Sequence, residues 1–126
     1  MDNQHEFRVR FVANNNSDRA KGLMFASPLD DDETALFVFP HSDRYGFWNK
    51  NVSFKLSLAF LDENQRIVDI KDLEAQSTQL VSPDKDAKYV VEAKGGAFDR
   101  LGIKTGDFLV YDSSLNKLKS VKLPHS

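Results

Sequence analysis

The side chains best suited to binding chemistry gather in one short segment, Phe47-Trp48-Asn49-Lys50-Asn51. An indole ring can stack on a sugar or a base, while an ammonium group and an amide can hold a carboxylate or a phosphate. Trp48, Lys50 and Asn51 are therefore candidate ligand-binding residues. Plainer interpretations stay open, because a lone tryptophan among phenylalanines also suits a core and a strand lysine can lay its stem over Trp48.

Arg19 is the fourth candidate binding residue, on the polar side of an expected helix. It could join Lys50 and Asn51 in an anion pocket, or pair with an aspartate for only ~0 to 1 kcal/mol if exposed.

An enzyme is the alternative to a binding domain. Lys50 would then act in acid/base chemistry with a carboxylate such as Asp62 or Asp107, which requires a pocketed lysine beside that carboxylate. The sequence assigns no catalytic residue.

The sequence lacks the residues or the spacing that several other common chemistries require. The chain has no cysteine, and its histidines are His5, His41 and His125. The run His41-Ser42-Asp43 has the residue types of a hydrolytic triad, but neighbours in one turn do not stack as a triad, so an exposed turn is predicted. Zinc-binding spacing is absent, and Asp30–Glu33 lacks the spacing of a calcium loop, which favours a solvated acidic loop. We predict no metal site and no cofactor.

Length and charge narrow the class of protein. The 126 residues suit a single domain, 1–126, with a core that needs no covalent staples. The 17 basic and 19 acidic residues give a formal charge of -2, which provides no field for a nucleic-acid backbone or an anionic membrane. No apolar run approaches the ~20 residues that span a bilayer. We expect a soluble monomer with no nucleic-acid partner and no membrane span, exported or periplasmic if a leader precedes the sequence and cytoplasmic otherwise.

A β-rich framework must position the candidate residues. Strands are expected where apolar residues alternate with polar ones. The clearest is Phe54–Leu61, with Phe54, Leu56, Leu58 and Phe60 on one face. The other expected strands are Phe7–Val12, Ala35–Phe39, Arg44–Asn49 as the return of a hairpin through a turn at Pro40–Asp43, Arg66–Ile70, Lys88–Ala93, Phe108–Tyr111 and, as a weaker final strand, Lys117–Leu123.

Two short helices are also expected. Ser17 suits the N-cap of a helix from Asp18 to about Phe25, in which Gly22 costs about 1 kcal/mol and so indicates a close backbone approach. The segment Lys94–Gly102 reads as a brief helix entered through glycines, whose pairing suits a tight turn better than an anion loop. The predicted fold class is mainly β with two short helices, arranged as a compact barrel-like or strongly twisted mixed sheet.

Five motifs occur together in the order and spacing of one known family. They are Arg19-x-Lys-Gly-Leu-Met24, Leu36-Phe-Val-Phe-Pro40, Phe47-Trp-x-Lys-Asn51, Phe60-Leu-Asp62 and Leu101-Gly-Ile-Lys-Thr-Gly-Asp107. Over about residues 7–111 the chain resembles the bacterial and archaeal family called domain of unknown function one hundred and ninety-two, an uncharacterised ancient conserved region. The resemblance implies a compact β-rich single domain, often behind an export signal or membrane anchor, with no agreed activity.

The chain departs from that family's pattern in and after the central motif. Where the family usually has methionine, threonine, proline and aspartate, this chain has Asn49, Val52, Lys55 and Ser57. If the family uses that aspartate and threonine as a hydrogen-bonding or acid/base pair, this member lacks the pair, which lowers the odds of catalysis. Lys50 and Asn51 are retained.

The function is unknown from sequence, and three hypotheses stand. The first and favoured one is a small non-catalytic binding domain for a polar or anionic ligand or partner, with its site at Phe47–Asn51. The second is the acid/base enzyme that uses Lys50. The third is a protein-interaction domain that uses edge strands or an exposed aromatic patch. A concave pocket lined by Trp48 and Lys50 would favour the first hypothesis, and a flat surface the third.

Overall fold

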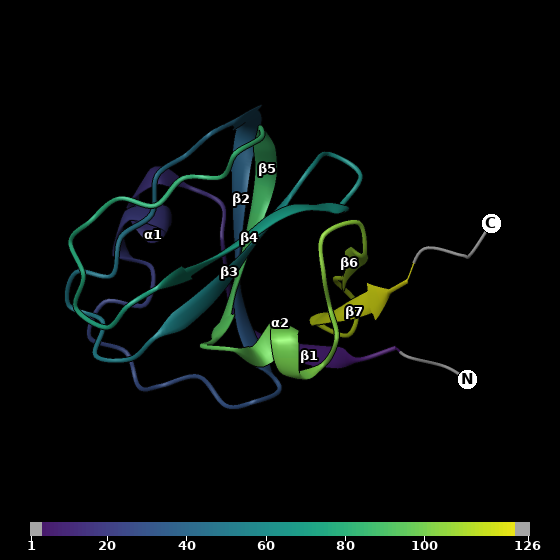
Figure 1. Ribbon diagram of the computed structural model, residues 1–126, viewed down its shortest axis with the longest axis horizontal. Coiled ribbons are helices and arrows are strands. Elements are labelled where there is room, and N and C mark those ends of the chain that lie inside the picture. Colours follow the sequence, from purple (N-terminus) through teal and green to yellow (C-terminus); the bar gives the residue numbers. More distant parts are fainter. Residues whose placement is uncertain (1–3, 123–126) are drawn as a thin grey trace.

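The computed structural model describes residues 4–122, which form one curled sheet and two short helices. The elements are β1 (Glu6–Ala13), α1 (Asn16–Lys21), β2 (Glu33–Asp43), β3 (Leu56–Leu61), β4 (Ile67–Leu73), β5 (Ala87–Lys94), α2 (Ala97–Arg100), β6 (Phe108–Asp112) and β7 (Lys117–Val121). The strand order is β4-β3-β5-β2-β1-β7-β6, and within the described residues only β1 and β2 pair in parallel. The sheet curls into a half-barrel, which confirms the predicted fold class (Figure 1).

The curl brings the two edges of the sheet together at one place. Arg66, just before β4, forms a bridge with Phe108 at the start of β6. The amide of Leu109 also donates to the carbonyl of Gln65 at 3.0 Å. The sheet edges are therefore joined locally, although β4 and β6 do not pair along their length.

The central strands are buried on both faces, because the sheet packs against a different core on each side. In β3 all six residues are buried, and they alternate between the two cores. Leu58 and Phe60 pack with Phe37 on one face, whereas Ala59 and Leu61 face the interior of the half-barrel. The predicted face of Phe54–Phe60 is thus confirmed, but the opposite face is buried as well.

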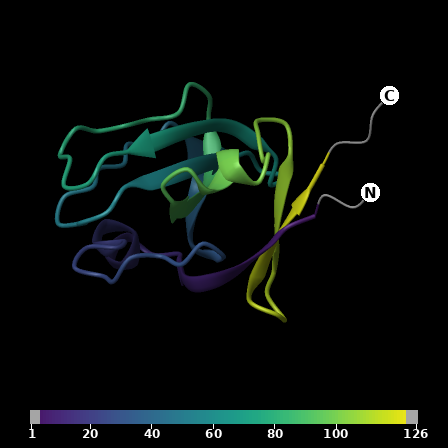
Figure 2. The ribbon, with the colours of Figure 1, turned by 60° about the horizontal axis from the view of Figure 1, so that its bottom comes forward.

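The two ends of the molecule carry different elements. Figure 1 shows α1 and the long connections 44–55 and 74–86 gathered at one end, and the β6–β7 hairpin at the other. The same separation is visible in the turned view of Figure 2. The connection that carries the candidate binding residues therefore lies beside α1, far from the hairpin.

The predicted hairpin at Pro40–Asp43 is wrong. Strand β2 continues through Pro40 to Asp43, and its pairing with β5 shifts register between Val38 and Asp43. Proline lacks the amide that a regular ladder needs, and an irregularity of this kind tolerates it. The segment 44–49 is likewise no strand of the sheet, because it pairs with the connection 74–86 instead, through a single bridge between Phe47 and Val81.

The first helix is shorter than predicted and begins earlier. Asn15, not Ser17, is the N-cap, and its side chain accepts a hydrogen bond from the amide of Asp18 at 2.8 Å. The helix ends at Lys21, and Gly22 is its C-cap, whose φ of 48° breaks the helical path. The expected close approach at Gly22 is not found, because a Cβ atom there would make only ordinary contact with Phe37, so the positive φ accounts for the glycine.

The second helix and the last strand are also shorter than predicted. Within Lys94–Gly102 only Ala97–Arg100 is helical, after Gly96 turns the chain at a φ of 84°. The amide of Gly96 donates to Ser57 Oγ at 2.8 Å, which agrees with a tight turn rather than an anion loop. Strand β7 ends at Val121, and Leu123 and His125 lie outside the described residues.

Candidate functional site

A cavity of about 280 Å³ opens between α1, the connection 44–55 and the sheet. We call it the aromatic cavity, because the rings of five aromatic residues line it. Its lining comprises Arg19, Ala20, Lys21, Gly22, Leu23, Met24, Phe37, Phe39, Tyr45, Gly46, Phe47, Trp48, Lys50, Val52, Leu80 and Glu92. The volume lies near the lower end of the ~300–1,000 Å³ that is usual for small-molecule sites. A small ligand would fit it.

The aromatic wall is built from rings that meet edge to face. Phe47 makes T-shaped contacts with Phe37 at 5.5 Å and with Phe60 at 6.1 Å between ring centres. Tyr45 stacks on Phe39 at 3.7 Å. Such pairs add roughly 0.5–1.5 kcal/mol each beyond the area they bury. Phe47 therefore anchors the connection 44–55 to the sheet and fixes the wall of the cavity.

Main-chain pairing and one buried amide hold the segment that follows Phe47. Phe47 and Val81 exchange two main-chain hydrogen bonds of 2.8 Å, and the amide of Asn49 donates to Ser77 at 2.8 Å. The Nδ2 atom of Asn49 donates to the carbonyls of Phe54 and Glu74 at 3.0 and 3.1 Å. Asn49 is only 1% exposed, so this side chain is a structural clamp.

Trp48 and Lys50 lie together at the mouth of the aromatic cavity. Trp48 is 43% exposed, which places it outside the core. The exposed Lys50 holds its Nζ atom 5.5 Å from the centre of the Trp48 ring. Attraction between the ammonium and the indole keeps the cation beside the opening. The structure thus brings two of the predicted residues to one place.

Arg19 reaches the same cavity from α1. Its guanidinium donates to the carbonyl of Val38 at 2.7 Å and to Asn16 Oδ1 at 2.6 Å, and it lies 5.1 Å from the centre of the Phe39 ring. It forms no ion pair with any described aspartate, in contrast to the plainer interpretation. Its positive charge therefore remains available to the cavity.

Asn51 occupies a different position from the other three predicted residues. It is not among the described residues that line the aromatic cavity. Its φ of 60° places it in the left-handed region, and its carbonyl accepts a hydrogen bond from the amide of Phe25 at 2.9 Å. Asparagine is one of the few residues that tolerate this conformation well. Asn51 shapes the turn next to the cavity.

Glu92 and Lys21 are charged cavity residues that sequence reasoning missed, and Glu92 is the buried one. It lies on β5 at the base of the aromatic cavity and is only 4% exposed. Its carboxyl group has no hydrogen-bond or ion-pair partner among the described residues. Burial raises the pKa of Glu92 to about 8, and no cation is close enough to offset that effect. The available signal was a single acid within the apolar run Tyr89–Ala93.

The carboxylates proposed to work with Lys50 lie elsewhere. Asp107 pairs with Lys122 at 2.6 Å and accepts from the amide of Lys104. Asp62 accepts from the amides of Asn64 and Arg66 in the β3–β4 turn. Neither lines the aromatic cavity, so neither is placed to assist Lys50.

Besides Asn49, two of the departures from the family pattern have structural roles in this chain. Ser57 donates to Asp72 at 2.8 Å and accepts from Gly96, so it ties β3 to β4 and to the turn before α2. Lys55 lies 3.6 Å from carboxylate oxygens of both Asp72 and Glu74. Both residues stabilise the scaffold and neither lines the aromatic cavity.

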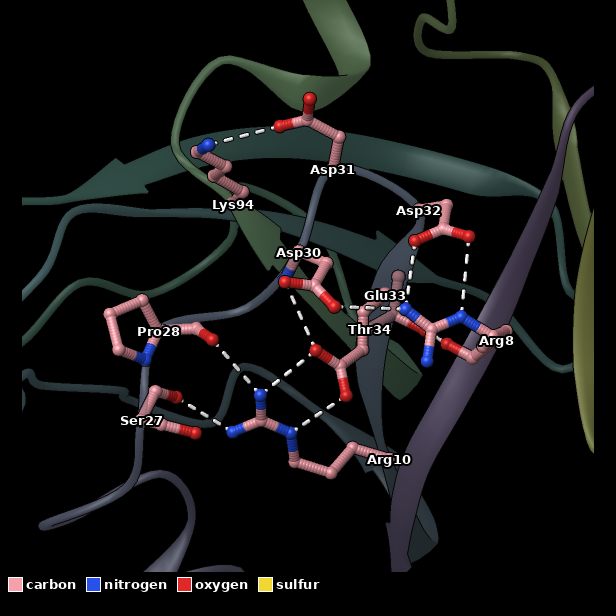
Figure 3. Close-up of polar contacts among 10 residues, drawn as sticks. All are labelled: Arg8, Arg10, Ser27, Pro28, Asp30, Asp31, Asp32, Glu33, Thr34 and Lys94. Carbon is pink, nitrogen blue, oxygen red and sulfur yellow. Dashed lines mark hydrogen bonds and ion pairs between the residues drawn. The ribbon is translucent and has the colours of Figure 1, made fainter.

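The acidic run Asp30–Glu33 forms ion pairs, as Figure 3 shows. Arg8 binds Asp30 and Asp32, and Lys94 binds Asp31 at 3.0 Å. Arg10 and Glu33 form a two-pronged pair at 2.8 and 2.9 Å, and Arg10 also donates to the carbonyls of Ser27 and Pro28. The three aspartates are exposed as predicted, but Glu33 is nearly buried. The run fastens the α1–β2 connection to β1 and β5.

Within residues 4–122 no group of three metal-binding side chains is close enough to hold an ion. The described helices are also too short and polar to cross a membrane.

The fold and the cavity together define the class of protein. It is a small half-barrel β domain with an aromatic cavity, rimmed by charged residues, on the face of the sheet opposite the interior of the half-barrel. Residues 1–111 match the family model described as DUF192, Uncharacterized ACR. The chain belongs to this family, whose function is not characterised. The resemblance drawn from the five sequence motifs is therefore confirmed.

Relatives and solved structures agree with this membership. A UPF0127 protein of Thermococcus gammatolerans is 31% identical over 106 residues, and one of Pyrococcus furiosus is 30% identical over 109 residues. Each match covers 82% of this chain, and the matches cover 66% and 86% of those proteins. This chain thus spans about two thirds of the Thermococcus protein's length.

Two solved structures share the fold. A protein of unknown function from Novosphingobium aromaticivorans is 31% identical, with a TM-score of 0.78 over 82% of this chain and 74% of that one. A protein of Sinorhizobium meliloti, provisionally described as a transcription regulator, has a TM-score of 0.76 at 24% identity over 83% of this chain and 88% of that one. At 24% identity, the similarity to the Sinorhizobium protein is evidence for a shared fold alone.

Proposed function

We propose that this domain binds a small polar or anionic molecule in the aromatic cavity and does not transform it. The observation that supports the proposal is the convergence of Arg19, Trp48 and Lys50 on one concave site. Aromatic walls bury the apolar part of a ligand, and a few placed polar groups orient it. We expect a monomer to suffice, because one chain supplies the whole lining.

Charge at the mouth supports an acidic group on the ligand. Arg19, Lys21 and Lys50 all line the cavity, and none forms an ion pair with a described carboxylate. Many other basic side chains in the molecule do form such pairs, for example Lys71 with Asp84. Cations that lack an ion-pair partner beside a cavity attract anionic ligands and form charge-assisted hydrogen bonds with them.

An enzyme is the second candidate function, and Glu92 is the observation that favours it. A buried carboxyl group with a raised pKa is a common general acid or base. Glu92 shares the cavity with Lys50, although the two form no ion pair. The interaction-domain hypothesis is weaker, because it expects a flat surface where the molecule has a cavity.

A ligand screen tests the binding function. Thermal unfolding would be measured against a panel of small metabolites for the wild type and for Lys50→Ala. The matched control is Lys88→Ala, which removes a lysine that also lies over a ring, 5.7 Å from Tyr89, away from the cavity. A ligand that raises the midpoint of the wild type and of Lys88→Ala, but less that of Lys50→Ala, supports the proposal. Equal shifts in all three proteins would reject the site.

Proton NMR of the incubated mixture separates the two candidates. An unchanged ligand spectrum after prolonged incubation supports binding alone, and the appearance of a product supports the enzyme.

A further inference from the structure

The unexplained group in the aromatic cavity is the carboxyl of Glu92. Alternation along β5 places Glu92 on the same face as Val90, opposite Val91 and Ala93, so its side chain enters the second core. Its strand neighbours are Ala35 of β2 and Leu58 of β3, whose side chains offer no polar atom. A buried carboxyl group without a protein partner costs free energy unless water or a ligand in the cavity meets it, so Glu92 calls for an explanation.

The surroundings of Glu92 differ between the base and the mouth of the cavity. The base is walled by Phe37 and Phe47, whereas the exposed cations Lys21 and Lys50 stand at the opening. An aromatic wall attracts cations to its ring faces. The cavity thus offers an acid and aromatic side chains inside, and positive charge at its mouth.

We propose that the ligand is zwitterionic, with an ammonium group that enters the cavity to meet Glu92 and an acidic group that stays at the mouth with Arg19 and Lys50. The inference rests on the proposed binding function and names its ligand class. A simple anion would leave Glu92 without a partner, and a simple amine would leave the cations at the mouth unused. A molecule with the two charges at opposite ends satisfies both.

Proton release is a consequence of this pairing. Near neutral pH the isolated carboxyl is mostly protonated, because burial holds its pKa at about 8. An incoming ammonium favours the carboxylate, so the proton leaves to solvent on binding. Other charged or titratable groups that face this cavity are Arg19 and Lys21 from α1 and Tyr45 and Lys50 from the connection 44–55. On the same side of β5, Lys94 is already paired with Asp31.

The probes are ω-amino acids of increasing length, from β-alanine to 6-aminohexanoate, together with pentylamine and pentanoate as analogues that lack one end. Titration calorimetry in buffers of different ionisation enthalpy gives the affinity and the number of protons released. We expect one chain length to bind best, with close to one proton released at pH 7 and almost none above pH 9.

Two variants locate the ends of the ligand. Glu92→Gln keeps the shape of the side chain but cannot ionise, and it should weaken the best zwitterion about tenfold or more while leaving pentanoate unaffected. Lys50→Ala should weaken both the zwitterion and pentanoate, but not pentylamine. Equal affinity for the zwitterion in Glu92→Gln and the wild type, or proton uptake on binding, would overturn the assignment.

The two proposals fail separately. If metabolites of another class bind in a manner that depends on Lys50 while no zwitterion binds, the ligand class is wrong and the binding site stands. If no compound of either set distinguishes Lys50→Ala from Lys88→Ala, both proposals fall.

Discussion

The Nδ2 atom of Asn49 donates a hydrogen bond of 3.1 Å to the carbonyl oxygen of Glu74, and so joins the connection 44–55 to the end of β4. Asn49 lies between Trp48 and Lys50 in the sequence, so the bond fixes the segment that carries this exposed pair. It explains how a segment with almost no regular secondary structure can hold two side chains at the mouth of a cavity.

Asn49→Asp should destabilise the protein, because a carboxylate cannot donate to the carbonyls of Phe54 and Glu74 and would stand buried against them. We expect the free energy of unfolding in urea to fall by about 2–4 kcal/mol. The control is Asn14→Asp, an exposed site before α1, where little change is expected. Equal losses in the two variants would show that Asn49 is no clamp.

The sheet could be predicted from sequence because alternation is a local signal. Phe7–Val12 and Phe108–Tyr111 lie within β1 and β6, and Lys88–Ala93 lies within β5. The prediction of a hairpin strand at Arg44–Asn49 failed because the partner of this segment is remote in the sequence. Residues 77–81 take up its main-chain hydrogen bonds, and no local sequence pattern indicates that pairing.

The candidate site could be predicted only in part, for a related reason. Trp48 and Lys50 stood out by type and spacing, and they do line the cavity. Glu92 did not, because a charged residue in a strand is expected to face solvent. Only the cover provided by α1 and the connection 44–55 turns that face into a buried one, and this cover depends on tertiary packing.

Asn51→Gly should leave both the fold and ligand binding intact. Glycine adopts the φ of 60° at least as readily as asparagine, while the side-chain amide is removed. Asn51→Val should lower the free energy of unfolding by roughly 1–3 kcal/mol, because a β-branched residue is strained in this region. Urea unfolding and calorimetry of both variants check this expectation. If Asn51→Gly abolished binding in a stable protein, the amide would belong to the site after all.

Glu33→Gln should destabilise the protein more than Asp32→Asn. The Arg10 and Glu33 side chains are 23% and 11% exposed, whereas those of Arg8 and Asp32 are 52% and 61% exposed. Loss of the shielded pair should cost about 1–3 kcal/mol, whereas loss of the solvent-exposed pair should change the free energy of unfolding very little. Urea unfolding at pH 7 measures both. Equal costs would mean that burial does not distinguish the two pairs in Figure 3.

The same pair should make the protein sensitive to acid. The Arg10 guanidinium lowers the pKa of Glu33 below its usual value of 4.5. The stabilisation is therefore fully present above the pKa of the unfolded chain and is lost as the pH falls through the lower value of the folded state. The unfolding midpoint of the wild type should drop at acidic pH more steeply than that of Glu33→Gln. Parallel pH profiles of the two proteins would contradict this link.

The Glu92 carboxyl should give the free energy of unfolding the opposite pH dependence, with stability falling as the pH rises. Its pKa of about 8 in the folded protein exceeds the ordinary value of 4.5, so the folded state holds a proton that the unfolded chain has released. The free energy of unfolding should then decrease as the pH rises from about 5 to 8 and level off above. The shift corresponds to a loss on the order of 3–5 kcal/mol for a fully buried group. Urea unfolding of the ligand-free protein from pH 5 to pH 9 measures it.

Glu92→Gln removes this ionisation and should flatten the profile. The variant should match the wild type near pH 5 and exceed its unfolding free energy at pH 9, because the amide stays neutral throughout. Glu63→Gln, at an exposed glutamate in the β3–β4 turn, is the matched control and should keep the wild-type slope. A wild-type profile that is flat between pH 5 and 9 would mean that the Glu92 carboxyl is solvated or paired in solution, and would remove the physical basis for an ammonium site at the base of the cavity.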